Sequence, residues 1–170
     1  MRQNGFFLTF ILLLIAQILL CNYFHFTQFI TLTILPVMIL CIPTRYSTTF
    51  ALFVAFFTGL AVDLLSDGVM GLNVCALVPV AFVRNGIIRM IFGEDLFSRG
   101  DDFTIKRYGT AKVSFAIICA QALFLVVYIW CDGAGTRPVW FNATRFACSL
   151  LAGSLLSLFI VDLLTPDDRK

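Results

Sequence analysis

Residues 47–65 read STTFALFVAFFTGLAVDLL, and this stretch decides the fold class. Asp63, close to its end, is the only charged side chain in it. An apolar α-helix needs about 20 residues to cross the hydrocarbon core of a bilayer, with about 17 as the lower limit. The stretch therefore predicts a transmembrane helix, and it makes an all-α membrane protein the first expectation for the chain.

The composition of all 170 residues supports this expectation. Hydrophobic residues make up 60% of the chain and charged residues only 13%, about half the charged share of an ordinary globular domain. The mean hydropathy is +0.95. This composition excludes a disordered protein, a nucleic-acid-binding protein and an ordinary cytosolic enzyme, and it indicates an integral membrane protein.

Apolar runs on both sides of the first stretch predict a single integral membrane domain over residues 1–170, folded as a polytopic bundle of six transmembrane helices. The spans are expected at about residues 5–21, 26–42, 47–65, 69–83, 110–130 and 140–164. The second span is short and contains Pro36, so a kink is expected. The second and fourth spans are both compatible with tilted, short or partly re-entrant helices. The first span lacks the small residues of a cleavage site before Cys21, so we expect it to stay attached as a helix.

The distribution of Lys and Arg predicts the orientation in the membrane. With the N-terminus inside, only Arg137 and Arg145 of the twelve basic residues lie on the outer side. Cytoplasmic loops carry an excess of Lys and Arg, so both termini of this multi-pass protein are predicted to be cytoplasmic. The one sizeable segment between spans is the cytoplasmic loop 84–109. Its first part, 84–92, either lies as a helix in the inner interface or continues the fourth span.

The reactive side chains do not form a catalytic or metal-binding pattern. None of the six cysteines is paired at the short spacing of metal ligands, and His25 is the only histidine. Hydrolase, zinc-protease and phosphate-loop motifs are absent from the sequence. We therefore predict that the protein is not an enzyme and that it holds neither a metal nor another cofactor.

Small residues spaced by four positions predict close helix contacts, because backbones approach each other where side chains are small. Such residues occur in the third, fifth and sixth spans, at Ala51, Ala55, Gly59 and Asp63, at Ala116 and Ala120, and at Ser149, Gly153 and Ser157. These seams serve either packing within the bundle or contact with a partner protein.

Charges at the outer ends of spans are costly to insert and therefore informative. Asp63 lies four residues before Asp67, and Arg145 lies near the outer end of the sixth span. We expect Asp63 and Arg145 to form an ion pair that joins the third helix to the sixth. The competing interpretation is that Asp63 points outward and docks a partner.

The segment FTGLAVDLLS at 57–66, followed by Gly71-Leu72-Asn73, resembles MreD, the rod shape-determining membrane protein family of bacteria. In that family a glycine–leucine pair precedes an aspartate near the end of one span, and a glycine opens the next span. The corresponding positions here are Gly59, Leu60, Asp63, Ser66 and Gly71.

Two further segments extend the resemblance, which covers residues 35–109. Outside this range the chain is similar to the family only in its length and number of spans. Ala81-Phe82-Val83-Arg84 and the charged loop before Tyr108-Gly109 are similar to the Bacteroidetes-like branch of the family. Relatives in that branch often have a histidine in the fifth span, where this chain has Cys119-Ala120-Gln121.

The resemblance implies a non-catalytic scaffold that maintains cell shape by binding MreC and linking it to peptidoglycan synthesis. It implies as further partners the RodA glycosyltransferase with its class B penicillin-binding protein, MreB filaments and membrane lipids, with no nucleic acid. It also implies a six-helix fold resembling the substrate-binding subunits of energy-coupling-factor transporters. The candidate binding or structural residues are Gly59, Asp63, Asp67, Gly71, Asn73, Arg84 and Arg145.

The residues themselves leave a second function open, that of a small-molecule-binding subunit of a transporter. Such a subunit presents polar and aromatic side chains that converge on a pocket. Few polar candidates lie near the short outer loops, which favours the scaffold. An ordinary secondary carrier is less compatible still, because neither an inverted repeat nor a pair of broken helices is evident in the sequence.

Overall fold

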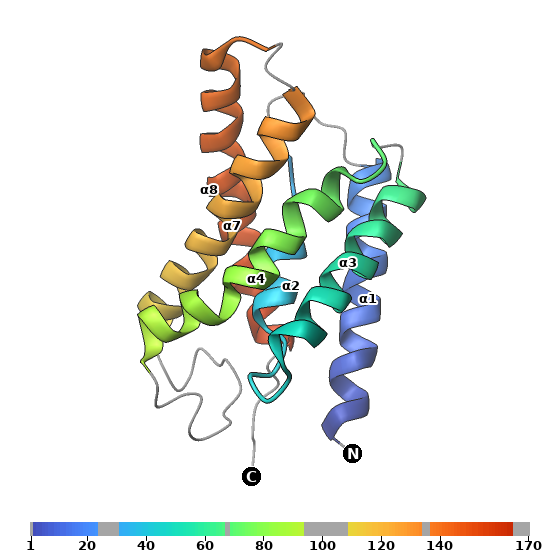
Figure 1. Ribbon diagram of the computed structural model, residues 1–170, viewed down its shortest axis with the longest axis vertical. Coiled ribbons are helices and arrows are strands. Elements are labelled where there is room, and N and C mark those ends of the chain that lie inside the picture. Colours follow the sequence, from blue (N-terminus) through green and yellow to red (C-terminus); the bar gives the residue numbers. More distant parts are fainter. Residues whose placement is uncertain (1, 24–30, 67–68, 94–108, 134–136, 165–170) are drawn as a thin grey trace.

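The computed structural model describes residues 2–23, 31–66, 69–93, 109–133 and 137–164, with side chains described from 6 to 161 within these ranges. Every regular element in this part of the chain is helical (Figure 1). The helices are α1 (Arg2–Tyr23), α2 (Leu35–Leu40), α3 (Thr48–Leu65), α4 (Leu72–Phe92), α7 (Thr110–Gly133) and α8 (Val139–Leu164).

Five of these helices, all except α2, are long and apolar enough to cross a membrane. The protein is thus an all-helical, multi-pass membrane protein, as the composition predicts. α3 packs against α4, α4 against α7, and α7 against α8, whereas α1 makes fewer contacts with the rest. From α3 to α8 successive long helices run in opposite directions, whereas α1 runs in the same direction as α3 and begins at the end of the bundle where α8 finishes (Figure 1).

The predicted helix over 26–42 is not confirmed. In its described part, 31–42, only the six residues of α2 are helical, and the backbone before them is irregular. Pro36 lies in the first turn of α2, a position that tolerates its missing N–H group. The expected kink at Pro36 is therefore replaced by the start of a short helix.

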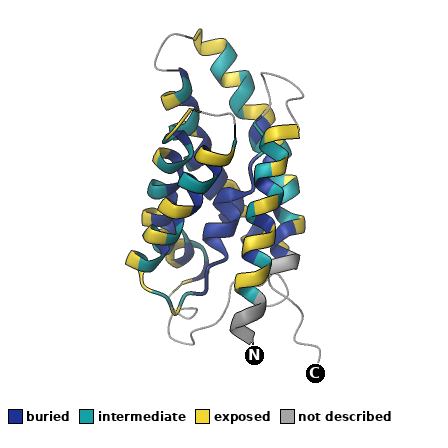
Figure 2. Ribbon diagram, turned by 90° about the vertical axis from the view of Figure 1, so that its right-hand side faces the viewer, coloured by how far each residue is buried: buried dark blue, intermediate teal, exposed yellow. Residues whose placement is uncertain are grey.

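The segment 31–42, which we call the central segment, lies in the middle of the bundle. α2 contacts all five long helices, and every one of its residues is buried. Figure 2 shows α2 in dark blue between the longer helices, whose outer faces carry the exposed residues. The hydrophobic core is therefore built around a short helix that cannot span a bilayer by itself.

The fourth span is longer than predicted. Helix α4 runs without interruption from Leu72 to Phe92, past the boundary expected at Val83. The part 84–92 of the predicted cytoplasmic loop is therefore a continuation of this helix, not a separate interfacial helix. Residues 94–108 of that loop lie outside the described residues.

The small-residue seams face the interior. Ala51 and Ala55 on α3 and Ala116 and Ala120 on α7 are fully buried. The three small residues of the α8 seam, at 149, 153 and 157, are buried as well. The seams therefore pack helices of this chain together, and the alternative in which they contact a partner is not supported.

Candidate functional site

Asp63 binds the N-terminus of α4. It lies in the last turn of α3 and is 4% exposed. Its Oδ2 accepts hydrogen bonds from the backbone N–H groups of Gly71 (3.0 Å) and Val74 (3.3 Å). Its Oδ1 accepts from the backbone N–H (3.1 Å) and the side-chain Nδ2 (2.9 Å) of Asn73. A carboxylate is favoured there because the first N–H groups of a helix lack partners within it and carry partial positive charge.

Two glycines make this arrangement possible. Gly71 precedes α4 with φ of +89°, a left-handed conformation that glycine adopts without strain. Gly59 lies against the backbone of α4, where a Cβ atom would be 2.9 Å from Cα of Val74. Together with Asp63 and Asn73, these residues form a unit that we call the α3–α4 hairpin. Four sequence-predicted candidates are thus brought together, and Asp67 lies outside the described residues.

The predicted ion pair between Asp63 and Arg145 is wrong. In the described part of the chain, Arg145 pairs with Asp132 on α7, through Nη1 and Oδ2. The Asp63 carboxylate is already surrounded by four donors that come from residues 71–74. Both groups are bound by residues closer in the sequence, and among the side chains that the structure describes no ion pair joins α3 to α8.

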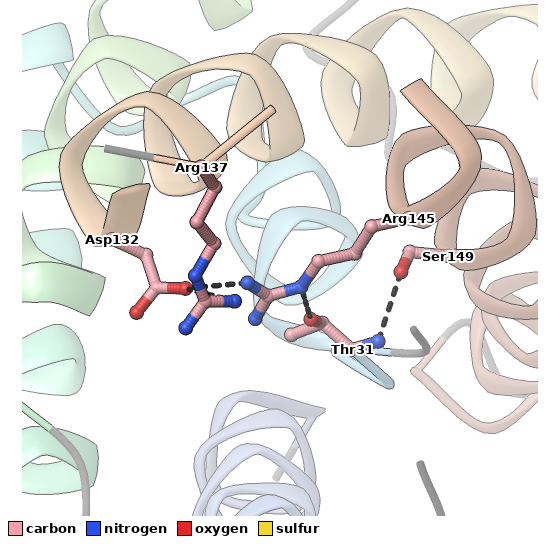
Figure 3. A network of polar contacts seen from close by, with 5 residues as sticks. All are labelled: Thr31, Asp132, Arg137, Arg145 and Ser149. Carbon is pink, nitrogen blue, oxygen red and sulfur yellow. Dashed lines mark hydrogen bonds and ion pairs between the residues drawn. The ribbon is translucent and has the colours of Figure 1, made fainter. Parts of the chain in front are cut away.

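Arg145 is part of a polar network at the end of the bundle where α7 and α8 are connected (Figure 3). Its Nε donates to Oγ1 of Thr31 (3.1 Å), and Oγ of Ser149 accepts from the backbone N–H of Thr31 (2.8 Å). Nη1 of Arg137 lies 3.7 Å from the same Asp132 oxygen. Arg145 is only 11% exposed by side chain, so the network attaches the start of the central segment to α7 and α8.

Two buried glutamines bind the irregular backbone of the central segment. Oε1 of Gln17 on α1 accepts from the N–H of Ile34 (2.8 Å), and its Nε2 donates to the carbonyl of Leu32 (3.4 Å). Nε2 of Gln121 on α7 donates to the carbonyl of Thr33 (3.3 Å). Irregular backbone inside a membrane is tolerated only where protein or water satisfies its polar groups, and here side chains from neighbouring helices do so.

Arg84 holds the other end of the central segment. It is completely buried in α4, and its guanidinium donates to the carbonyl of Leu40 (3.3 Å), to the carbonyl of Ile42 and to Oδ1 of Asn85 (3.1 Å). A cation is favoured at the C-terminus of a helix, where the last carbonyls lack partners. The charge at Arg84 therefore does not mark the end of α4, as the sequence suggested, but stabilises the end of α2.

From the sequence, no structural role was predicted for Gln17 or Thr31, and Gln121 was only a departure from relatives. Asp132 was one of three outer carboxylates, with Asp63 and Asp67, that could pair with Arg137 or Arg145, and the structure selects it. The one common signal of these residues is a polar side chain within or beside an apolar run, which does not reveal its partner. His25 lies outside the described residues.

Most polar contacts of the candidate residues are made within the chain, so these residues stabilise the fold. Gly59, Asp63, Gly71 and Asn73 hold the α3–α4 hairpin, and Arg84 and Arg145 hold the central segment. Among the described residues, no three His, Cys, Asp or Glu side chains are grouped so that they could hold a metal ion. No family model, no curated protein and no solved structure matches the chain.

Proposed function

We propose that this protein is a membrane scaffold of the bacterial cell-elongation machinery, similar to MreD. In this role it binds an MreC-like partner and links it to the enzymes that synthesise peptidoglycan, a RodA-like glycosyltransferase with its class B penicillin-binding protein, and to MreB filaments. It is proposed to reside in the inner membrane with both termini in the cytoplasm.

The observation that carries the proposal is the α3–α4 hairpin. Gly59, Asp63 and Gly71, three of the residues on which the resemblance to MreD rests, belong to one contact unit. In it Asp63 accepts from three backbone N–H groups at the start of α4, and Gly59 packs on Val74. An aspartate whose oxygens are both hydrogen-bonded within the chain positions helices. This favours a protein that presents a fixed surface to partners over one whose aspartate carries ions.

The part of the chain that the structure describes has five long helices. The central segment supports a sixth crossing. It connects the far end of α1 to the start of α3, at opposite ends of the bundle (Figure 1). If the segment crosses the membrane, the two termini lie on the same side. This arrangement is the form in which we propose the resemblance to the substrate-binding subunits of energy-coupling-factor transporters.

Reporter fusions test this topology. A reporter that is active only outside the cytoplasm is expected to be active when fused after Asp132 and inactive when fused after Lys170, because ten of twelve basic residues are then inside. A fusion after Thr44, between α2 and α3, is expected to be inactive as well. A fusion after Tyr23, at the end of α1, is expected to be active. Equal signals after Tyr23 and Thr44 would mean that the central segment does not cross the membrane, and they would reject the six-crossing topology. Equal signals after Asp132 and Lys170 would mean that α8 does not cross.

Co-purification tests the scaffold. The tagged protein and an MreC-like protein encoded by the same bacterium are co-expressed, extracted in mild detergent and captured through the tag. We expect the partner to be retained at a constant ratio, whereas an unrelated single-span protein expressed to the same level is washed away. Depletion of the protein in a rod-shaped host that encodes it is expected to give rounded cells. Loss of the partner on washing together with unchanged cell shape would refute the proposal.

A transporter subunit is the second candidate, and the discontinuous central segment favours it. Transporters often bind substrates where a helix is interrupted near the middle of the membrane. Here Gln17 and Gln121 hydrogen-bond to the interrupted backbone, which favours a structural role for the interruption. Native mass spectrometry distinguishes the two: a stoichiometric small molecule, retained by the wild type and lost in Gln121→Leu, would favour the transporter subunit.

A further inference from the structure

An apolar groove of about 410 Å³ lies between α1 and α3. Its walls carry three phenylalanines from each helix, which are Phe6, Phe7, Phe10, Phe50, Phe53 and Phe57. The two helices diverge towards the end of the bundle at which α1 begins (Figure 1), and α1 contacts α3 only sparsely. The groove is therefore open along the surface that faces the membrane.

The size of the groove limits what fills it. A helix with its side chains is about 10–12 Å across and rises 5.4 Å per turn, so the groove holds about one turn of a partner helix. A single acyl chain is much narrower and can lie along the groove between the rings. Phe10 is 9% exposed at its base, while Phe53 on its wall is 61% exposed, so the groove has both depth and an accessible side.

A cation is located beside the groove. Tyr46 lines it and stacks on Phe50, with ring centroids 4.7 Å apart. The guanidinium carbon of Arg45 lies 5.1 Å from the centroid of the Tyr46 ring, and Arg45 is exposed. In the part of the chain that the structure describes, the salt bridges are those of Asp132, so Arg45 is not neutralised by an acidic side chain there.

We infer that this groove binds one acyl chain of an anionic phospholipid, whose phosphate group is bound by Arg45. The apolar rings accept the chain, and the exposed guanidinium supplies hydrogen-bond donors that match a phosphate. The end of the bundle that carries Arg45 is the proposed cytoplasmic end, and anionic lipids are concentrated in the cytoplasmic leaflet. Only this leaflet assignment rests on the proposed orientation, and the site is independent of MreC binding.

Native mass spectrometry of the detergent-solubilised protein tests the site. The protein is titrated with dioleoyl phosphatidylglycerol and, separately, with dioleoyl phosphatidylcholine, which has the same chains but no net charge. We expect phosphatidylglycerol to bind more tightly, and Arg45→Gln to reduce this preference about fivefold, as for the loss of one interfacial basic residue. Arg137→Gln is the matched control, since its guanidinium also lies over an aromatic ring, that of Phe141 (5.4 Å).

A second pair of variants tests the groove separately from the charge. Phe53→Ala is expected to weaken binding of both lipids, and Phe159→Ala, which truncates a ring on α8 that is 76% exposed, is expected to leave both unchanged. Inorganic phosphate is expected not to compete at concentrations that saturate binding of the lipid. Equal affinity for the two lipids, an unchanged preference in Arg45→Gln, or full competition by phosphate alone would each overturn the inference.

Discussion

Gly59→Leu is expected to prevent the α3–α4 hairpin from closing. A Cβ atom at this position would lie 2.9 Å from both N and Cα of Val74, and these neighbours are backbone atoms that cannot rotate away. Inserting bulk into a tightly packed contact costs about 3 kcal/mol when the surroundings cannot relax. We expect the variant to lose most of its monodisperse fraction in detergent and to melt well below the wild type.

Gly86→Leu is the matched control for this substitution. Gly86 lies in α4, the helix against which Gly59 packs, and a Cβ atom there would meet nothing within 4 Å. Because leucine favours a helix more than glycine does, the stability should be unchanged or raised by about 0.5–1 kcal/mol. Gly59→Ala should fall between the two. If Gly59→Leu and Gly86→Leu melt at the same temperature, α3 and α4 do not approach as closely as the structure shows.

Asp63→Asn is expected to destabilise the same hairpin for an electrostatic reason. The carboxylate accepts four hydrogen bonds, and an asparagine would direct an NH₂ group at donors from Gly71 and Val74 or from Asn73. Leaving buried donors without an acceptor, with the loss of charge, costs about 3 kcal/mol. The free energy of unfolding, measured by titration with a denaturing detergent, should fall accordingly.

Double-mutant cycles identify the partner of Asp63. Asp63→Asn and Asn73→Ala should be non-additive, because Nδ2 of Asn73 donates to the carboxylate (2.9 Å). Asp63→Asn and Arg145→Gln should add within about 0.5 kcal/mol, because Arg145 is paired with Asp132 instead. Strong coupling between Asp63 and Arg145 would show that the ion pair suggested by the sequence exists after all.

The positions of the long helices were predictable because hydrophobicity and length are local properties of a sequence. The span predicted at 47–65 is α3, Thr48–Leu65, with Ser47 as its N-cap, whose Oγ accepts from the N–H of Phe50 (3.3 Å). The span predicted at 140–164 is α8, which begins one residue earlier. In both cases the apolar segment is long enough to cross a bilayer. There a helix satisfies the backbone hydrogen-bonding groups within the segment itself.

The partners of the polar residues were not predictable in the same way. Asp63 was recognised as informative, yet the expected cation was wrong, because its donors are backbone N–H groups that become available only where α4 starts beside it. The charge of Arg84, directly after the predicted span 69–83, suggested the end of that span. Arg84 lies inside α4, because the carbonyls of Leu40 and Ile42 provide acceptors that the sequence cannot place next to it.

Local properties of the sequence establish that this is a helical, multi-pass membrane protein. They also establish where α1, α3, α7 and α8 lie, and that small residues mark their contacts. These properties depend on the balance of apolar and polar side chains within one segment. The packing of the helices, by contrast, determines that half of the segment 31–42 stays irregular and that Gln17, Gln121 and Arg84 stabilise it. Irregular backbone in the middle of the bundle is stable only when donors and acceptors from distant segments form hydrogen bonds with it. Whether those groups lie close enough depends on how all the helices pack together.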